Sequence, residues 1–178
     1  TILIRSPLVM KSPSVTTSTN CSSNRPLPAG RSTVSATPVA PSNDCAAAWL
    51  AVYLARSEAI KRNGVVSLCP SLDGERCALA GTPWHRGWIV FVNGDRDTPA
   101  VRDDGEDLLR VYAPWERGEV SANRATLSFR SLGQVGVTAT FTFCDDRGPR
   151  AARAVIISQT GRPRVSDRSS SNGLLVCG

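Results

Sequence analysis

The stretch LARSEAIKRNG, residues 54–64, marks the point at which a helix gives way to strands. The run that leads into it, from Ala46, is apolar on nearly every side, as in a helix buried against a large surface. Lys61 and Arg62 complement the negative carbonyl end of a helix, and Gly64 can adopt the left-handed conformation that ends one. We therefore predict a helix that stops at residue 62.

Every candidate element after this helix is a strand, because each is short and bounded by turn residues. The predicted strands are residues 65–69, 87–92, 107–112, 125–130, 137–144 and 153–159. Apolar residues alternate with threonines in 137–144, as in an antiparallel strand with one exposed face, whereas the apolar run in 87–92 indicates a central strand. With a polar cap at residues 42–44, the sequence predicts an α+β domain over residues 44–178, in which a helix at 44–62 packs on antiparallel β-sheet.

The first 43 residues differ in composition from the rest of the chain. They are rich in Ser, Thr and Pro, contain no acidic residue, and show neither helical nor strand periodicity. Such a segment cannot bury enough apolar surface to offset the entropy of ordering, so we predict that residues 1–43 are disordered. No window of the chain reaches the roughly 18 consecutive apolar residues of a membrane-spanning helix.

The six cysteines form no C-x-x-C pair, which argues against a zinc ribbon or a redox dithiol. Cys69 and Cys77 bracket a turn-rich loop, while Cys144 ends a strand and Cys177 lies one residue from the end of the sequence. We predict that these four cysteines pair in that way. Such disulfides favour the periplasm or the cell exterior, and free buried thiols are the alternative. The sequence indicates no role for the two remaining cysteines.

Positive charge is concentrated near the end of the chain. The formal net charge is +6, but residues 93–119 hold eight acids against four bases, whereas residues 147–168 hold six arginines against one acid. Guanidinium groups on neighbouring strands and loops can bind successive phosphates without reading bases, which makes these arginines candidates for DNA binding. They are Arg147, Arg150, Arg153, Arg162, Arg164 and Arg168. The alternative is a solvated face whose arginines pair with Asp145, Asp146 and Asp167.

The sequence gives little support for a metal site, a cofactor site or a catalytic site. The acidic loop at residues 93–104 fits a calcium loop poorly, because Thr98 stands where the sharp turn needs glycine. The chain has a single histidine and no motif of a hydrolase, a metalloprotease or a phosphate-binding loop. We expect no enzymatic activity, no metal and no cofactor.

Several motifs occur in order between residues 49 and 177: LARSEAIKRN, W-x-x-G-W-I-V-F-V from Trp84, FTFCDDRG and ISQTGRPR. In this order and spacing they resemble the GspH/FimT family of minor pilins and pseudopilins. The resemblance implies a type IV pilin-like fold, a long N-terminal helix packed on β-sheet. It also implies partnership with other minor and major pilins or pseudopilins. Some pilus members bind DNA during natural transformation, and the resemblance associates the family's G-R-x-R, matched by residues 161–164, with that binding.

Residues 1–43 depart from the family pattern. Members begin with a short basic leader and about 20 apolar residues that form the membrane-spanning half of the helix. We therefore expect only the C-terminal half of that helix here, and hypothesise that the N-terminal segment is out of frame or otherwise not the native pilin start. The resemblance implies an inner-membrane protein with a periplasmic domain that moves to the pilus or cell surface. The inner membrane is a partner only if the native helix is present.

The function expected from these observations is that of a FimT/FimU-like minor pilin of a type IV pilus. Such a subunit would cap or prime the pilus and bind DNA for uptake without sequence preference, through its C-terminal arginines. The alternative is a GspH-like minor pseudopilin of a type II secretion system with no role in DNA binding.

Overall fold

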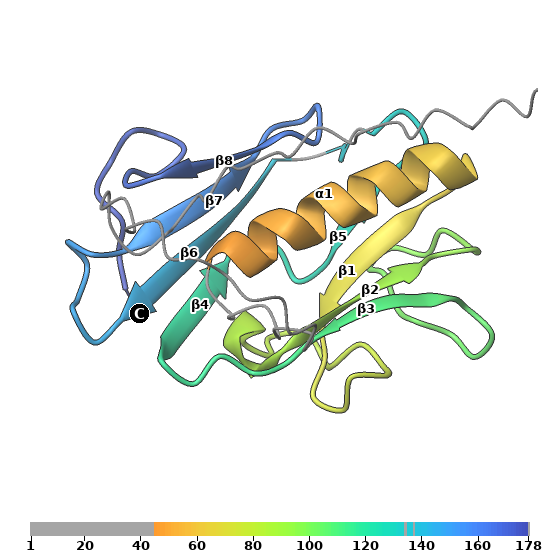
Figure 1. Cartoon of the computed structure of the whole chain (residues 1–178), viewed down its shortest axis with the longest axis horizontal. Helices are drawn as coiled ribbons and strands as arrows, with labels where there is room; N and C mark the ends of the chain where they lie inside the picture. Colours follow the sequence, from red (N-terminus) through yellow and green to blue (C-terminus); the bar gives the residue numbers. More distant parts are fainter. Residues whose placement is uncertain (1–44, 134, 137, 178) are drawn as a thin grey trace, which may run out of the picture.

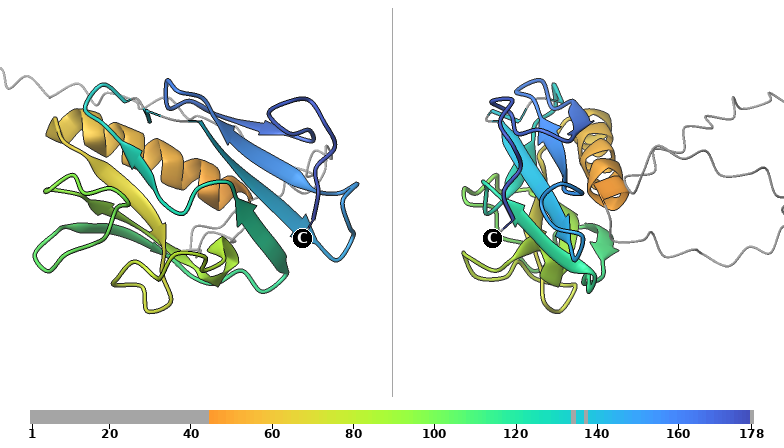
Figure 2. Two further views of the ribbon diagram at one scale, coloured as in Figure 1. Left: turned by 180° about the vertical axis from the view of Figure 1, so that it is seen from behind. Right: turned by 90° about the vertical axis from the view of Figure 1, so that its left-hand side faces the viewer.

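The computed structural model describes residues 45–133, 135–136 and 138–177, which form one helix and two four-stranded antiparallel sheets (Figure 1). The helix lies against both sheets, and a side view shows it as a separate layer on one side of them (Figure 2). This arrangement confirms the predicted α+β class. The prediction that residues 1–43 are disordered lies outside the described residues.

Helix α1, Cys45–Arg62, presents its small side chains to the sheets. Its buried residues are Cys45, Ala47, Ala48, Ala51, Val52, Ala55 and Ala59. Because alanine adds little bulk, the helix axis can approach the strands closely, and alanine also has the highest helix propensity. The predicted helix is confirmed. Among the described residues, no helix is both long and apolar enough to cross a bilayer.

The end of α1 differs in one detail from the expectation. The residue with positive φ is Asn63, at 49°, rather than Gly64. Asn63 N–H donates to the Ile60 carbonyl at 3.2 Å, and Gly64 N–H donates to the Ala59 carbonyl at 3.1 Å. These are the two hydrogen bonds of a Schellman motif, in which asparagine can replace glycine at the left-handed position because its short polar side chain tolerates that conformation.

Sheet A has the order β3-β2-β1-β5 and sheet B the order β4-β6-β7-β8. Sheet A consists of β1 (Val66–Pro70), β2 (Trp88–Val92), β3 (Leu108–Tyr112) and β5 (Leu127–Phe129). Sheet B consists of β4 (Gly118–Ala122), β6 (Ala139–Asp145), β7 (Arg153–Ile157) and β8 (Pro163–Ser166). All six predicted strands are present, and β2 is central as expected. The sequence analysis missed β4, β8 and the 3₁₀ turn η1 (Trp84–Arg86).

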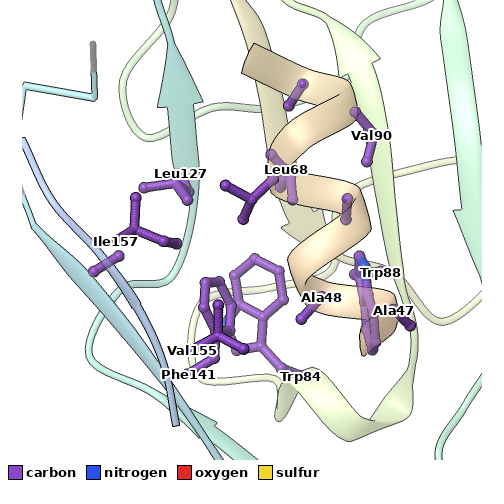
Figure 3. Close-up of a cluster of buried hydrophobic side chains, with 14 of the residues drawn as sticks. Ala47, Ala48, Leu68, Trp84, Trp88, Val90, Leu127, Phe141, Val155 and Ile157 are labelled. Atoms are coloured by element: carbon purple, nitrogen blue, oxygen red, sulfur yellow. The ribbon is translucent and has the colours of Figure 1, made fainter. Parts of the chain in front are cut away.

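One continuous core fills the space between α1 and the inner faces of both sheets (Figure 3). The alternation in β6 places Phe141 and Phe143 in this core. Trp84 packs edge-to-face on Phe141, with ring centroids 4.7 Å apart, and its indole N–H donates to the Arg124 carbonyl at 3.0 Å. The buried tryptophan therefore satisfies its one polar group while it joins the two sheets.

The outer face of each sheet is covered by a segment that a disulfide holds in place. Cys69 and Cys77 are bonded on sheet A with Cα atoms 5.5 Å apart, and Cys144 and Cys177 on sheet B with Cα atoms 5.8 Å apart. Both predicted pairings are therefore confirmed. Cys45, which received no role from the sequence, is buried at the start of α1 and is also disulfide-bonded.

Candidate nucleic-acid interface

The six candidate arginines all belong to sheet B and its connections, but they do not form one cluster. Strands β7 and β8 run antiparallel, with Ile157 opposite Pro163 and Ala154 opposite Ser166. Arg162 therefore lies at the β7–β8 turn. Four of the other arginines lie at or beyond the opposite end of these strands. They are Arg147, Arg150, Arg153 and Arg168.

The two groups are separated by the length of β7. Four residue steps lead from Arg153 to Ile157, which at about 3.3 Å per step is roughly 13 Å. Single-stranded phosphates are only a few ångströms apart, so one bound strand would have to run along the sheet to reach both groups. Arg164 lies between them, exposed in β8 opposite Ile156.

Arg147 is engaged by an acid of its own loop. Its Nε donates to Asp145 Oδ2 at 2.9 Å, and its backbone N–H donates to Asp145 Oδ1 at 3.0 Å. The side-chain hydrogen bond from Arg147 lowers the pKa of Asp145, and the same bond raises the pKa of Arg147. For this residue the alternative expectation, pairing with Asp145, is what the structure shows.

The other five arginines keep their charge uncompensated within the described part of the chain. No ion pair there involves Arg150, Arg153, Arg162, Arg164 or Arg168. Arg153 is held in position, since its Nη1 donates to the Ala152 carbonyl at 2.8 Å. Residues 147–166 contain no acid, so the field around β7 and β8 is positive.

The glycine of the G-R-x-R motif has a packing role. Gly161 has a φ of 72°, and an ideal Cβ there would lie 2.1 Å from the carbonyl oxygen of Gly133. Only glycine allows the β7–β8 turn to cross the β5–β6 connection this closely. The crossing is reinforced by a hydrogen bond from Val135 N–H to the Gln159 carbonyl at 3.2 Å. The position of Arg162 is thereby fixed relative to β5 and α1.

Arg164 lies beside the C-terminal segment. Val165 pairs with Val155 and packs in the core under α1, so Arg164 and Ile156 face the opposite side of sheet B. Ile156 packs there with Leu175, in the same cluster as Cys144 and Cys177. As expected, the Cys144–Cys177 disulfide ties the end of the chain to the sheet that carries the arginines.

The acidic loop that fitted a calcium site poorly uses its carboxylates internally. Asp97 accepts from the Asn93 side-chain amide at 2.9 Å and from Val101 N–H at 2.9 Å. Glu106 accepts from Gly94 N–H at 2.6 Å and from Asp103 N–H at 3.1 Å. Among the described residues there is no group of His, Cys, Asp or Glu side chains arranged to hold a metal ion.

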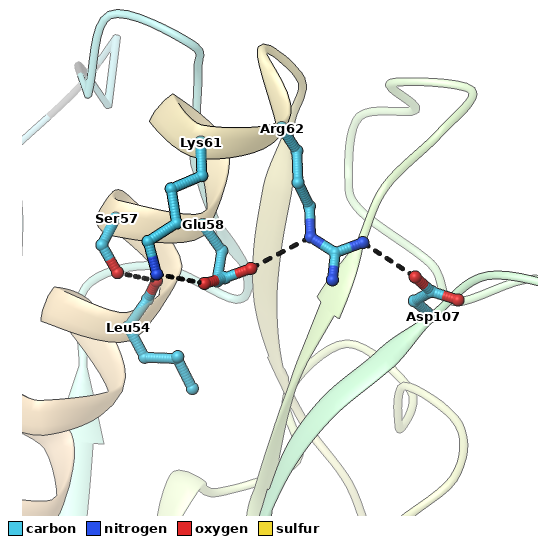
Figure 4. Close-up of polar contacts among 6 residues, drawn as sticks. All are labelled: Leu54, Ser57, Glu58, Lys61, Arg62 and Asp107. Atoms are coloured by element: carbon cyan, nitrogen blue, oxygen red, sulfur yellow. Dashed lines mark hydrogen bonds and ion pairs between the residues drawn. The ribbon is translucent and has the colours of Figure 1, made fainter. Parts of the chain in front are cut away.

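An ion-pair chain that the sequence analysis missed joins this acidic loop to the end of α1 (Figure 4). Glu58 pairs with Lys61 at 2.9 Å and with Arg62 at 3.0 Å, and Arg62 also pairs with Asp107 at 2.8 Å. The i, i+3 and i, i+4 spacing of the first three residues could have indicated the helical part of this chain. The bases at the end of α1 are therefore compensated, unlike Arg162 and Arg164 of sheet B, which form no ion pair with a described residue.

Comparison with known proteins identifies relatives of the whole fold. The sequence model of the family described as Type II transport protein GspH matches residues 50–161. Two crystal structures of the type IV minor pilin FimU from Pseudomonas aeruginosa are each 20% identical to this chain and cover 73% of it. The match covers 94% of the first FimU chain and 89% of the second, with TM-scores of 0.52 and 0.50.

A third solved structure, the minor pseudopilin EpsH from the type 2 secretion system of Vibrio cholerae, is 13% identical. The match covers 68% of this chain and 91% of EpsH, with a TM-score of 0.46. A comparison with curated proteins gave no match.

Proposed function

This chain belongs to the GspH family, and on that basis we propose that it acts as a minor pilin at the tip of a type IV pilus, where it caps or primes the fibre. The fold it shares with the FimU structures supports this role. Its partners would be other minor and major pilins. The disulfides support a periplasmic and then surface location, because such bonds persist in oxidising compartments.

The single observation that best supports assembly is the outer face of α1. Leu50, Tyr53 and Ile60 are 49%, 42% and 45% exposed, although the opposite face of the helix is fully buried. Their 3- and 7-residue spacing places them on one side of α1, and Trp49 packs against Tyr53 with ring centroids 4.1 Å apart and the ring planes tilted by 47°. Exposed apolar side chains on one side of a surface helix are suited to packing against other subunits.

Deletion of the gene in its own organism tests the assembly role. We expect loss or shortening of surface pili, restored by the wild-type gene but poorly by a Leu50→Ser/Tyr53→Ser variant, since both side chains are exposed and their loss should spare the fold. Intact pili together with failure to secrete folded proteins would instead support the alternative, a GspH-like pseudopilin of a type II secretion system. The description of the matching family keeps that alternative in view.

The second part of the proposal is DNA binding without sequence preference through the arginines of sheet B. Arg162 and Arg164 are exposed, and no described residue forms an ion pair with either of them. Arg168, Arg153 and Arg150 extend the set toward the other end of the sheet, while Arg147 is partly neutralised by Asp145. Guanidinium groups arranged in this way contact phosphates rather than base edges.

Salt dependence of binding tests this part. If Arg162, Arg164 and two neighbouring arginines contact four phosphates, the affinity of the full chain for a labelled oligonucleotide should fall with salt at a log–log slope near roughly −3. The Arg162→Gln/Arg164→Gln variant should weaken binding equally for unrelated sequences. Unchanged affinity in that variant would remove these two residues from the interface.

A further inference from the structure

We propose that Arg56 of α1 and Arg130 at the end of β5 join Arg162 to form one phosphate-binding surface, the hairpin-end patch. These residues are far apart in the sequence: Arg56 lies in α1, Arg130 directly follows β5, and Arg162 directly precedes β8. The inference rests on the proposed DNA binding and extends it, because neither Arg56 nor Arg130 belongs to the C-terminal arginine set. It assigns the partner as a nucleic-acid phosphodiester backbone.

The contacts around Gly133 link Arg56 to the two turns that carry Arg130 and Arg162. An ideal Cβ on Gly133 would lie 3.0 Å from Arg56 Nε and 3.0 Å from Ile60 Cδ1, so the side chain of Arg56 lies directly over this glycine. Gly133 N–H donates to the Arg130 carbonyl at 2.7 Å, which places Arg130 at the other end of the same tight turn. The carbonyl of Gly133 in turn touches Gly161, the residue before Arg162.

No acid neutralises this patch within the described residues. Ion pairs to Arg56, Arg130 and Arg162 are absent there, and Arg56 Nε is buried without a hydrogen-bond partner. Residues 120–144 contain no Asp or Glu, like residues 147–166. The one acid of α1, Glu58, is occupied by Lys61 and Arg62. Three like charges held near one another without counterions attract a polyanion.

The shape of the patch favours a polymer over a small anion. Arg130 and Arg162 are exposed, and so are two apolar side chains of the same region: Ile60, which lies over Gly133 with Arg56, and Leu132 of the adjoining turn. A single phosphate needs several donors converging on one point, whereas a chain of phosphates can use guanidinium groups spread over a surface. The exposed apolar side chains add contacts to sugars and bases.

Fluorescence anisotropy with the full chain and a labelled 20-mer oligonucleotide tests the proposal. At about 0.1 M salt, each lost arginine–phosphate contact should weaken binding roughly fivefold, so Arg56→Gln/Arg130→Gln should bind roughly 25-fold more weakly, with a salt slope about 1.5 shallower. The matched control, Arg76→Gln/Arg110→Gln, removes the same charge from exposed positions on sheet A and should stay within about twofold of the wild type.

Two single variants distinguish a loss of binding from a loss of folding. Arg130→Gln changes an exposed side chain and should alone lower affinity about fivefold with an unchanged melting temperature. Arg56→Lys keeps the charge over Gly133 and should retain most of the binding. Loss of binding in Arg56→Lys with an intact fold would contradict an electrostatic role.

The outcomes separate this inference from the proposed function. If Arg162→Gln/Arg164→Gln weakens binding but Arg56→Gln/Arg130→Gln does not, the hairpin-end patch is wrong and DNA binding stands. If the wild type shows no salt-dependent binding, the proposed DNA binding fails and the patch with it. Replacing chloride by phosphate at constant ionic strength should leave the affinity unchanged, and a selective loss in phosphate would show a single-anion site and overturn the proposal.

Discussion

Sheets A and B are built alike but carry opposite charge. Each packs α1 on its inner face and has its outer face covered by a disulfide-held segment. On sheet A the connection between β2 and β3 is acidic, and its carboxylates cap backbone N–H groups or pair with Arg62 and Arg76. On sheet B most arginines have no such partner among the described residues. Charges that stabilise local structure are compensated locally, whereas uncompensated charges remain available to a ligand.

The Cys144–Cys177 and Cys69–Cys77 disulfides should differ in their contribution to stability. Cys144–Cys177 closes a separation of 33 residues and Cys69–Cys77 one of 8. On the loop-closure model their removal should cost about 4 and about 2.5 kcal/mol, because the longer loop restricts the unfolded chain more. Urea unfolding of Cys144→Ala/Cys177→Ala and Cys69→Ala/Cys77→Ala measures both. A larger loss for the short bridge would mean that strain or residual structure, rather than chain entropy, determines the difference.

Gly161→Ala should be strongly destabilising. Its methyl group would collide with the Gly133 carbonyl at a positive φ, and we expect a loss of about 3 kcal/mol or more in the free energy of unfolding. Gly148→Ala is the matched control, since φ there is 81° but an added Cβ meets nothing within 4 Å. It should cost only about 1 kcal/mol. Equal losses would show that the crossing with Gly133 does not matter.

The smallest effect is expected from Asp73 in the Cys69–Cys77 loop. Its carboxylate accepts from the backbone N–H groups of Arg76 at 2.9 Å and Glu75 at 2.8 Å, which lower its pKa to about 2. The folded pKa lies below the unfolded value of about 3.9, so the stabilisation is complete above about pH 4 and is lost as the pH falls toward 2.

Asp73→Asn should therefore lower stability slightly at pH 7, where the wild-type carboxylate is ionised, and remove part of the acid-induced loss of stability between pH 4 and pH 2. Thermal unfolding across this range, compared with the wild type, measures the effect. Identical pH profiles for the two proteins would mean that Asp73 is not held as a carboxylate by these N–H groups.

The helix, six strands and two of the disulfides could be predicted from the sequence because each has a local signal. The alternation of Phe141 and Phe143 with threonines is one such signal. Strand β8 was missed because Pro163 and Arg164 break any period-2 pattern, and β4 because Gly118 and Glu119 are poor strand formers. Both strands are held by pairing with β6 and β7, which only the tertiary fold supplies.

The spatial arrangement of the arginines could not be predicted from the sequence for a similar reason. Their clustering in residues 147–168 suggested one patch, but the antiparallel course of β7 and β8 sends Arg153 and Arg162 to opposite ends of the sheet. Conversely, the crossing of Gly133 and Gly161 brings Arg56 and the turn that begins at Arg130 close to the β7–β8 turn that carries Arg162. Residues that are close in the sequence can therefore lie at opposite ends of a sheet when they belong to one antiparallel hairpin.

The difference between the two sheets is tested most directly by a pair of charge-matched triple variants. Arg162→Gln/Arg164→Gln/Arg168→Gln and Arg76→Gln/Arg96→Gln/Arg110→Gln each lower the formal net charge from +6 to +3. We predict that the first weakens oligonucleotide binding about 100-fold at 0.1 M salt and makes the salt slope shallower by about 2, whereas the second changes affinity by no more than a few-fold. Equal losses in the two variants would show that only net charge matters and would contradict a binding surface on sheet B.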